Sequence, residues 1–88
     1  MASYRLFIKP SAAREIEAIP KKERLRIIRR IQDLSDNHRP PGCEKLSGQD
    51  KYRVRQGQYR IIYSVSDDEL IVCVVKVGHR RDVYMGGI

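Results

Sequence analysis

The sequence is poor in the residues that several common kinds of protein depend on. It has only two cysteines, Cys43 and Cys73, which lie far apart in the chain, so neither a disulfide framework nor a cysteine-based metal site is expected. No apolar run approaches the roughly 20 residues that a membrane-spanning helix needs. We therefore expect a cytoplasmic protein with no membrane association, no bound metal and no cofactor.

Acidic residues are the other class in short supply. Lysine and arginine total 18 against 11 aspartates and glutamates, which leaves a formal net charge of +7. This excess indicates an anionic partner such as nucleic acid or an acidic protein. A chain of 88 residues has room for one hydrophobic core, so we expect a single domain over residues 1–88.

Residues 51–63 have the pattern of a β-hairpin, because two runs rich in aromatic and β-branched residues flank Gln56-Gly57. If Gln56-Gly57 is a two-residue loop, Arg53 lies opposite Arg60. Side chains alternate along a strand, so Arg53, Arg55 and Arg60 are expected on one face of the hairpin. The other face would be apolar and carry Tyr52, Val54, Tyr59 and Ile61.

Three arginines on one face repel one another and call for a counter-ion. No acidic residue lies between Lys51 and Ser66, so the hairpin itself offers none. A guanidinium is planar and permanently charged, and it can donate two parallel hydrogen bonds to phosphate oxygens. A solvated basic surface is the alternative interpretation, but three arginines opposite an apolar face favour a phosphate-binding site.

The segments around the hairpin predict an α+β fold. Residues 4–9 form a short strand that ends at Pro10, and residues 12–19 and 21–36 form two helices. The apolar run of residues 70–77 indicates a strand in the middle of a sheet. We therefore predict two N-terminal helices packed on one face of a mainly antiparallel four-stranded sheet, in the order β-α-α-β-β-β, with the arginines on the uncovered face.

The second predicted helix has an apolar stripe and a basic outer surface. The stripe recurs at intervals of three, at Leu25, Ile28, Ile31 and Leu34, and Ile27 widens it. The outer surface carries Lys21, Lys22, Arg24, Arg26, Arg29 and Arg30 against Glu23 and Asp33. Such a run is usually a solvated face, and a second, salt-sensitive contact with nucleic acid is the alternative. The sequence leaves both interpretations open.

The end of the chain, Val77-Gly78-His79-Arg80 followed by Tyr84, completes a family pattern. Together with the hairpin and Lys45-Leu46, it makes the chain resemble the RelE toxins of toxin-antitoxin pairs, in the RelE/ParE superfamily, over nearly its whole length. The resemblance implies a RelE-like fold and a ribosome-dependent endoribonuclease. Such an enzyme cuts messenger RNA in the A site without a metal ion and so inhibits translation. It also implies a RelB-like antitoxin that neutralises the toxin in a hetero-oligomer.

The resemblance also implies roles for individual residues. The catalytic residues would be Arg53, Arg55, Arg60, Arg80 and Tyr84, and the RNA-binding residues would be Lys45, Lys51, His79 and Arg81. Metal-free RNA cleavage requires a proton to leave the 2′-hydroxyl, the charge of the phosphorane to be stabilised and the departing 5′ oxygen to be protonated. Arginine can stabilise charge but is a poor acid or base, so Tyr84 is the candidate base and His79 could shuttle protons.

Two other functions fit parts of the same pattern. A ParE-like toxin would bind DNA gyrase instead of cutting RNA, although that branch generally lacks the full set of basic residues and the tyrosine. A catalytically silent module would use the basic surface only to hold an antitoxin or RNA.

Overall fold

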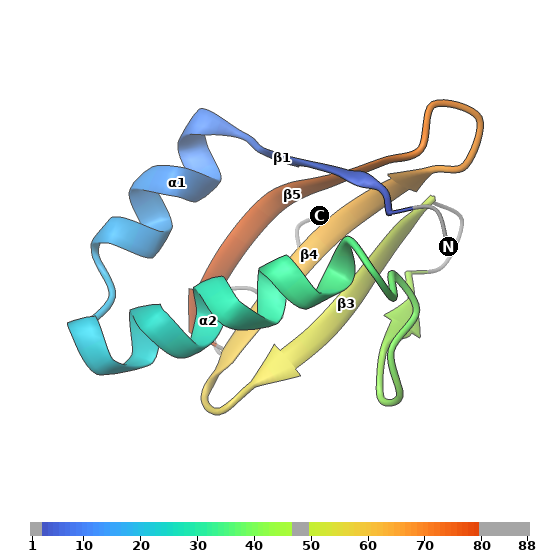
Figure 1. Ribbon diagram of the computed structural model, residues 1–88. Coiled ribbons are helices and arrows are strands. Elements are labelled where there is room, and N and C mark those ends of the chain that lie inside the picture. Colours follow the sequence, from blue (N-terminus) through green and yellow to red (C-terminus); the bar gives the residue numbers. More distant parts are fainter. Residues whose placement is uncertain (1–2, 47–49, 80–88) are drawn as a thin grey trace.

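The computed structural model describes residues 3–46 and 50–79, which form two helices and five strands (Figure 1). In chain order these are β1 (Arg5–Ile8), α1 (Pro10–Glu17), α2 (Lys21–Leu34), β2 (Glu44–Lys45), β3 (Lys51–Gln56), β4 (Tyr59–Ser66) and β5 (Ile71–His79). Neither helix in this part of the chain is both long and apolar enough to span a membrane.

The strands form one mixed sheet in the order β1-β5-β4-β3-β2. β1 runs parallel to β5, and the other neighbours are antiparallel. β5 lies between β1 and β4, which confirms its predicted place in the middle of the sheet. The predicted count of four strands is wrong by one, because β2 was not foreseen. A strand of two residues is too short to leave a periodic pattern in the sequence.

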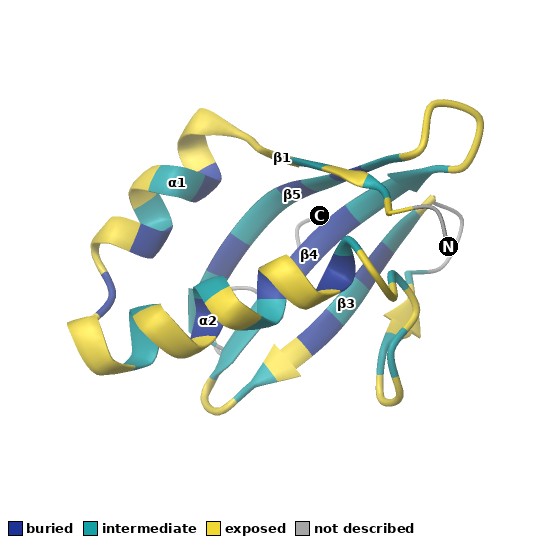
Figure 2. Cartoon of the chain, in the orientation of Figure 1, coloured by how far each residue is buried: buried dark blue, intermediate teal, exposed yellow. Residues whose placement is uncertain are grey.

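Both helices lie on the same side of the sheet, as predicted (Figure 1). Buried residues of the helices and of β3, β4 and β5 make up one core (Figure 2). The helical segment contributes Ala12, Ile16, Ile19, Ile27, Ile31 and Leu34 to this core, and the sheet contributes Tyr52, Val54, Ile61, Tyr63, Val72, Val74 and Val77. The hairpin's apolar face is therefore the face that the helices cover.

The helix boundaries differ from the predicted ones at both prolines. α1 begins at Pro10, two residues before the predicted start at 12, because proline suits the first helical position, where its missing N–H would have no partner. α1 ends at Glu17, since Pro20 disfavours helical backbone at the residue before it. α2 ends at Leu34, not at residue 36, and Ser35 is its C-cap.

The predicted apolar stripe of α2 is wrong at Leu25, whose side chain is 56% exposed. At 3.6 residues per turn, a step of three falls roughly 60° short of a full turn, so a strict interval of three drifts around the helix. Three such steps carry Leu25 to the side opposite Leu34. The other predicted members fit: Ile27, Ile31 and Leu34 form the buried side of α2, and Ile28 packs partly buried against the core.

A polar cluster joins three distant segments at the start of β1. The Tyr4 hydroxyl donates to Asp67 Oδ1 over 2.7 Å, which joins the residue before β1 to the β4–β5 turn. Arg39, in the α2–β2 loop, donates from Nε and Nη2 to the Tyr52 hydroxyl at 3.2 and 3.1 Å. Its Nη2 also lies 3.6 Å from Asp67 Oδ2. These contacts hold the loop that leads into β2.

The reassigned stripe of α2 predicts unequal costs for two similar truncations. Ile27 is fully buried, so Ile27→Ala should lower the free energy of unfolding by about 2–5 kcal/mol. Leu25→Ala should change it by less than about 0.5 kcal/mol. Urea denaturation followed by circular dichroism measures both values, and equal losses would contradict the packing described here.

The polar cluster predicts a pH-dependent contribution to stability. The hydrogen bond from Tyr4, together with the charge of Arg39, holds the pKa of Asp67 below its ordinary value of 3.8. An acid whose pKa is lowered by folding adds stability above its unfolded pKa and loses it as the pH falls through the folded pKa.

Tyr4→Phe should therefore lower the melting temperature at neutral pH, and its difference from the wild type should shrink as the pH falls below about 4. Thermal unfolding over a pH series measures this. A difference that is the same at every pH would show that Tyr4 contributes packing alone.

Candidate nucleic-acid interface

The hairpin turns at Gly57-Gln58, and the predicted loop at Gln56-Gly57 is wrong by one residue. Gly57 has a φ of +62°, in the left-handed region that glycine adopts without a steric cost. Glycine at the first central position of a two-residue hairpin loop is typical of a type II′ turn. Arg55 therefore lies opposite Arg60, and Arg53 lies opposite Ile62.

This change of register leaves the faces of the hairpin as predicted. Moving the turn by one residue gives each residue a partner two positions further along, and residues two apart share a face. Arg53, Arg55 and Arg60 thus lie together on the side of the sheet away from the helices, which we call the arginine face. Ile62, opposite Arg53, is a buried apolar residue on this face.

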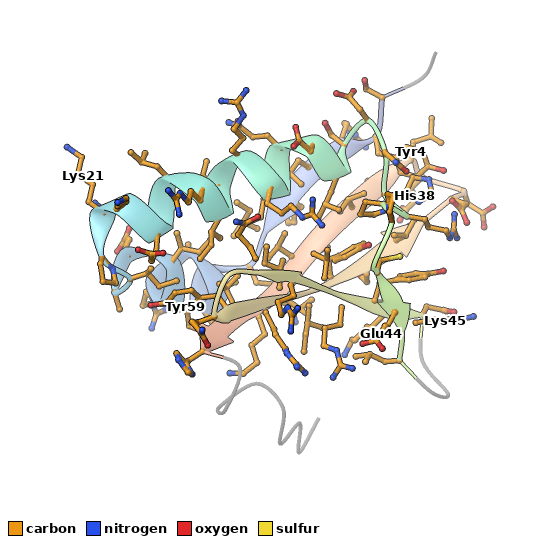
Figure 3. All side chains as sticks on the ribbon, turned by 90° about the horizontal axis from the view of Figure 1, so that it is seen from below. Tyr4, Lys21, His38, Glu44, Lys45 and Tyr59 are labelled. Carbon is orange, nitrogen blue, oxygen red and sulfur yellow. The ribbon has the colours of Figure 1, made fainter. Side chains whose placement is uncertain are left out.

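Glu44, which lies outside the hairpin in β2, is a counter-ion on the arginine face that the sequence did not predict. It pairs with Arg53 across β2 and β3, and Arg53 donates to Glu44 Oε1 from Nε at 3.2 Å and from Nη2 at 2.5 Å. Figure 3 shows Glu44 on the side of the sheet away from α2. The hydrogen bond and charge of Arg53, with a further contribution from the charge of Arg60, lower the pKa of Glu44.

A cavity of about 410 Å³ opens where the arginine face meets the edge of β3 beside α2. It is lined by Arg30, Gly42, Glu44, Arg53, Val54, Arg55 and Arg60. Four of these side chains carry a permanent positive charge and one carries a negative charge. Arg30 comes from α2 and borders the cavity beside β3, where β2 pairs only with Tyr52 and Arg53 and leaves the rest of the strand edge uncovered. The cavity is suited to an anion with several oxygen atoms.

The other predicted RNA-binding residues are dispersed. Lys51 begins β3 on the arginine face, outside the cavity lining. Lys45 is exposed and pairs with Tyr52, which places it on the helix side of the edge strand. His79 pairs with Tyr59 at the end of β5, also on the helix side, with the two ring centroids 5.8 Å apart. The predicted residues Arg80, Arg81 and Tyr84 lie outside the described residues.

Within residues 3–46 and 50–79, no group of three or more His, Cys, Asp or Glu side chains is arranged to hold a metal ion. Among the described residues the cavity therefore offers guanidinium groups and one carboxylate for binding and charge stabilisation. Two charged members of the lining were not predicted: Glu44, and Arg30, which was expected on a separate helical surface.

Comparisons with known proteins agree with this fold. Residues 6–84 match the family model described as the ParE toxin of the type II toxin-antitoxin system, parDE. A curated Escherichia coli protein described as RelE-like toxin is 28% identical over 85 residues, which cover 92% of this chain and 90% of that protein.

Two solved structures are similar over most of the chain. RelE in the archaeal RelE–RelB complex of Pyrococcus horikoshii is 28% identical with a TM-score of 0.81, covering 89% of this chain and 96% of that one. The isolated E. coli RelE toxin is 26% identical with a TM-score of 0.77, covering 97% and 95%. The predicted RelE-like fold in the RelE/ParE superfamily is confirmed, and the chain belongs to the ParE toxin family of type II toxin-antitoxin systems.

Proposed function

We propose that this toxin is a ribosome-dependent endoribonuclease that cuts messenger RNA in the A site without a metal ion and thereby inhibits translation. One observation carries the proposal. Arg53, Arg55 and Arg60 meet on the face that the helices leave open, and all three line one cavity. A cationic cavity of this kind fits a phosphodiester better than it fits an uncharged ligand.

The cavity's chemistry matches the central requirement of RNA cleavage. When the 2′-hydroxyl attacks the phosphate, negative charge grows on the phosphorane oxygens. Guanidinium groups that the sheet already holds in place stabilise this charge without having to reorganise. Arg55 and Arg60 lie directly opposite each other, an arrangement that destabilises a strand pair through like-charge repulsion. A bound phosphate relieves that repulsion.

Glu44 holds one of these arginines in position when RNA is absent. Both hydrogen bonds from Arg53 go to the same carboxylate oxygen, Oε1. The side chain of Arg53 is only 24% exposed, whereas that of Glu44 is 65% exposed. The carboxylate can therefore move into solvent more readily than the guanidinium can. An RNA phosphate would compete with Glu44 for Arg53.

In this proposal the proton-transfer residues come from the C-terminal part of the sequence. Tyr84 would take the proton from the 2′-hydroxyl, because nearby positive charge favours its ionised form. Arg80 would hold the phosphate or face the leaving group. If His79 shuttles a proton, it does so from the end of β5, where its ring packs against Tyr59 on the helix side of the sheet.

We infer that the toxin acts in the cytoplasm and is neutralised by a RelB-like antitoxin in a hetero-oligomer. The similar P. horikoshii RelE was solved in complex with RelB. The net charge of +7 and the arginine face favour an antitoxin segment rich in acidic side chains. Carboxylates on the arginine face would block the phosphate site in the way that Glu44 already occupies Arg53.

The proposal predicts cleavage of messenger RNA on translating ribosomes. Primer extension on a cell-free translation reaction should show new 5′ ends with the wild-type protein and none on the same RNA without ribosomes. Arg60→Ala should reduce the cleavage rate by about 100-fold, the usual effect of removing one charge-stabilising donor. Tyr84→Phe should be comparably defective.

The matched control is Arg14→Ala, because Arg14 is exposed on α1 and does not line the cavity. This variant should cleave at the wild-type rate. Since the matching family model describes ParE, a gyrase-binding toxin is the second candidate, and a gyrase supercoiling assay belongs beside the primer extension. If messenger RNA stays intact and gyrase is inhibited, the protein is a gyrase-binding toxin and the nuclease proposal fails.

A further inference from the structure

The outer surface of α2 borders a second cationic cavity next to the first. This cavity has a volume of about 350 Å³ and is lined by Arg26, Arg29, Arg30, Asp33 and Gln56. Arg30 lines both cavities. The two hollows therefore meet at one guanidinium group, and positive charge continues from the arginine face to the exposed side of α2.

Arg30 has a donor that the described residues leave unused. Its Nε atom is buried and has no hydrogen-bond partner among them. A buried polar donor without a partner is costly, and the cost is larger for a charged group. A turn of the Arg30 side chain toward the junction of the two cavities would bring this donor to an oxygen atom of a ligand and remove this cost.

The second cavity carries an excess of positive charge, with three arginines against one aspartate. Within the described residues, Arg26, Arg29 and Arg30 form no ion pair within 4.0 Å, although Asp33 lies in the same cavity lining. Arginines in a merely solvated helix surface commonly pair with acids three or four residues away. Here Asp33 does not pair with them within 4.0 Å, so the arginines remain available to a ligand.

The edge of β3 connects the two cavities. β2 pairs with β3 only at Tyr52 and Arg53, so no strand of the described residues covers the edge from Val54 to Gln56. Val54 lines the first cavity and Gln56 lines the second. An extended polyanion can follow this edge from one cavity into the other.

We propose that Arg26, Arg29 and Arg30 form a second phosphate subsite, which binds the RNA backbone beside the phosphate held on the arginine face. The inference rests on the proposed function, because it takes RNA as the ligand of the first cavity. A single phosphate would fill one cavity, whereas a strand with regularly spaced phosphates fills both. The subsite binds backbone and so adds affinity without base specificity.

The test separates binding from cleavage by using RNA that cannot be cut. Fully 2′-O-methylated RNA lacks the attacking hydroxyl, so fluorescence anisotropy reports affinity alone, for a dinucleotide and for a hexanucleotide over a range of salt concentrations. The Arg26→Gln/Arg29→Gln variant should bind the hexanucleotide roughly tenfold more weakly. Its plot of log K against log salt should be shallower by about 1.4, or 0.7 for each lost contact. Dinucleotide binding should stay at the wild-type value.

The matched control is Lys21→Gln/Lys22→Gln, which removes two charges from the same helix outside both cavities. It should weaken hexanucleotide binding less than about threefold. Arg26→Lys/Arg29→Lys keeps both charges and should retain most of the salt dependence. If the glutamine variant fails to fold, this variant is the test, because losing the paired hydrogen bonds of arginine should still weaken hexanucleotide binding.

Two results would overturn the proposal. One is equal weakening by the arginine and lysine pairs, which would show that only total charge matters. The other is that poly-glutamate binds in competition with RNA and that Arg26→Gln/Arg29→Gln weakens poly-glutamate binding as much as it weakens hexanucleotide binding. That result would assign the surface to an acidic protein. If messenger RNA on translating ribosomes stays intact while Arg26→Gln/Arg29→Gln still weakens hexanucleotide binding, the second subsite is supported and the nuclease proposal fails.

Discussion

Repulsion among guanidinium groups on one face of the hairpin is the constraint on which the rest of the structure depends. Arg55 faces Arg60 directly, and Arg53 is two residues from Arg55 on the same strand. Within the described lining of the cavity, Glu44 is the one side chain of opposite charge. The local charge therefore stays strongly positive, and this excess is what supports the proposal of an anionic ligand from outside the chain.

The hydrophobic core is what holds this unfavourable arrangement in place. The residues of β3 and β4 that alternate with the arginines are Tyr52, Val54, Ile61 and Tyr63, and all four are buried in the core that the helices complete. A shift of one residue in the strand register would bury the arginines and expose these four apolar side chains, so the loss of the core opposes such a shift. The packing of α1 and α2 thus determines which face carries the charge, and function depends on fold stability through this coupling.

The faces of the hairpin could be predicted because alternation is local and does not depend on where the turn lies. The turn itself could not, since glycine fits either central position of a two-residue loop. Glu44 was missed because its strand has two residues and its pairing with Arg53 depends on a loop held by Arg39. Arg30 was assigned to a separate surface because its place beside the cavity depends on how α2 crosses the sheet, which helical periodicity does not encode.

The most direct test of this account is the affinity of the Glu44→Gln variant for a fully 2′-O-methylated RNA. Removing the carboxylate frees Arg53 and leaves the cavity with four arginines and no opposing charge. The account predicts RNA binding about two- to fivefold tighter than in the wild type, with a steeper dependence on salt. Unchanged or weaker binding would contradict it, because the arginine face would then not be the site where RNA phosphates bind.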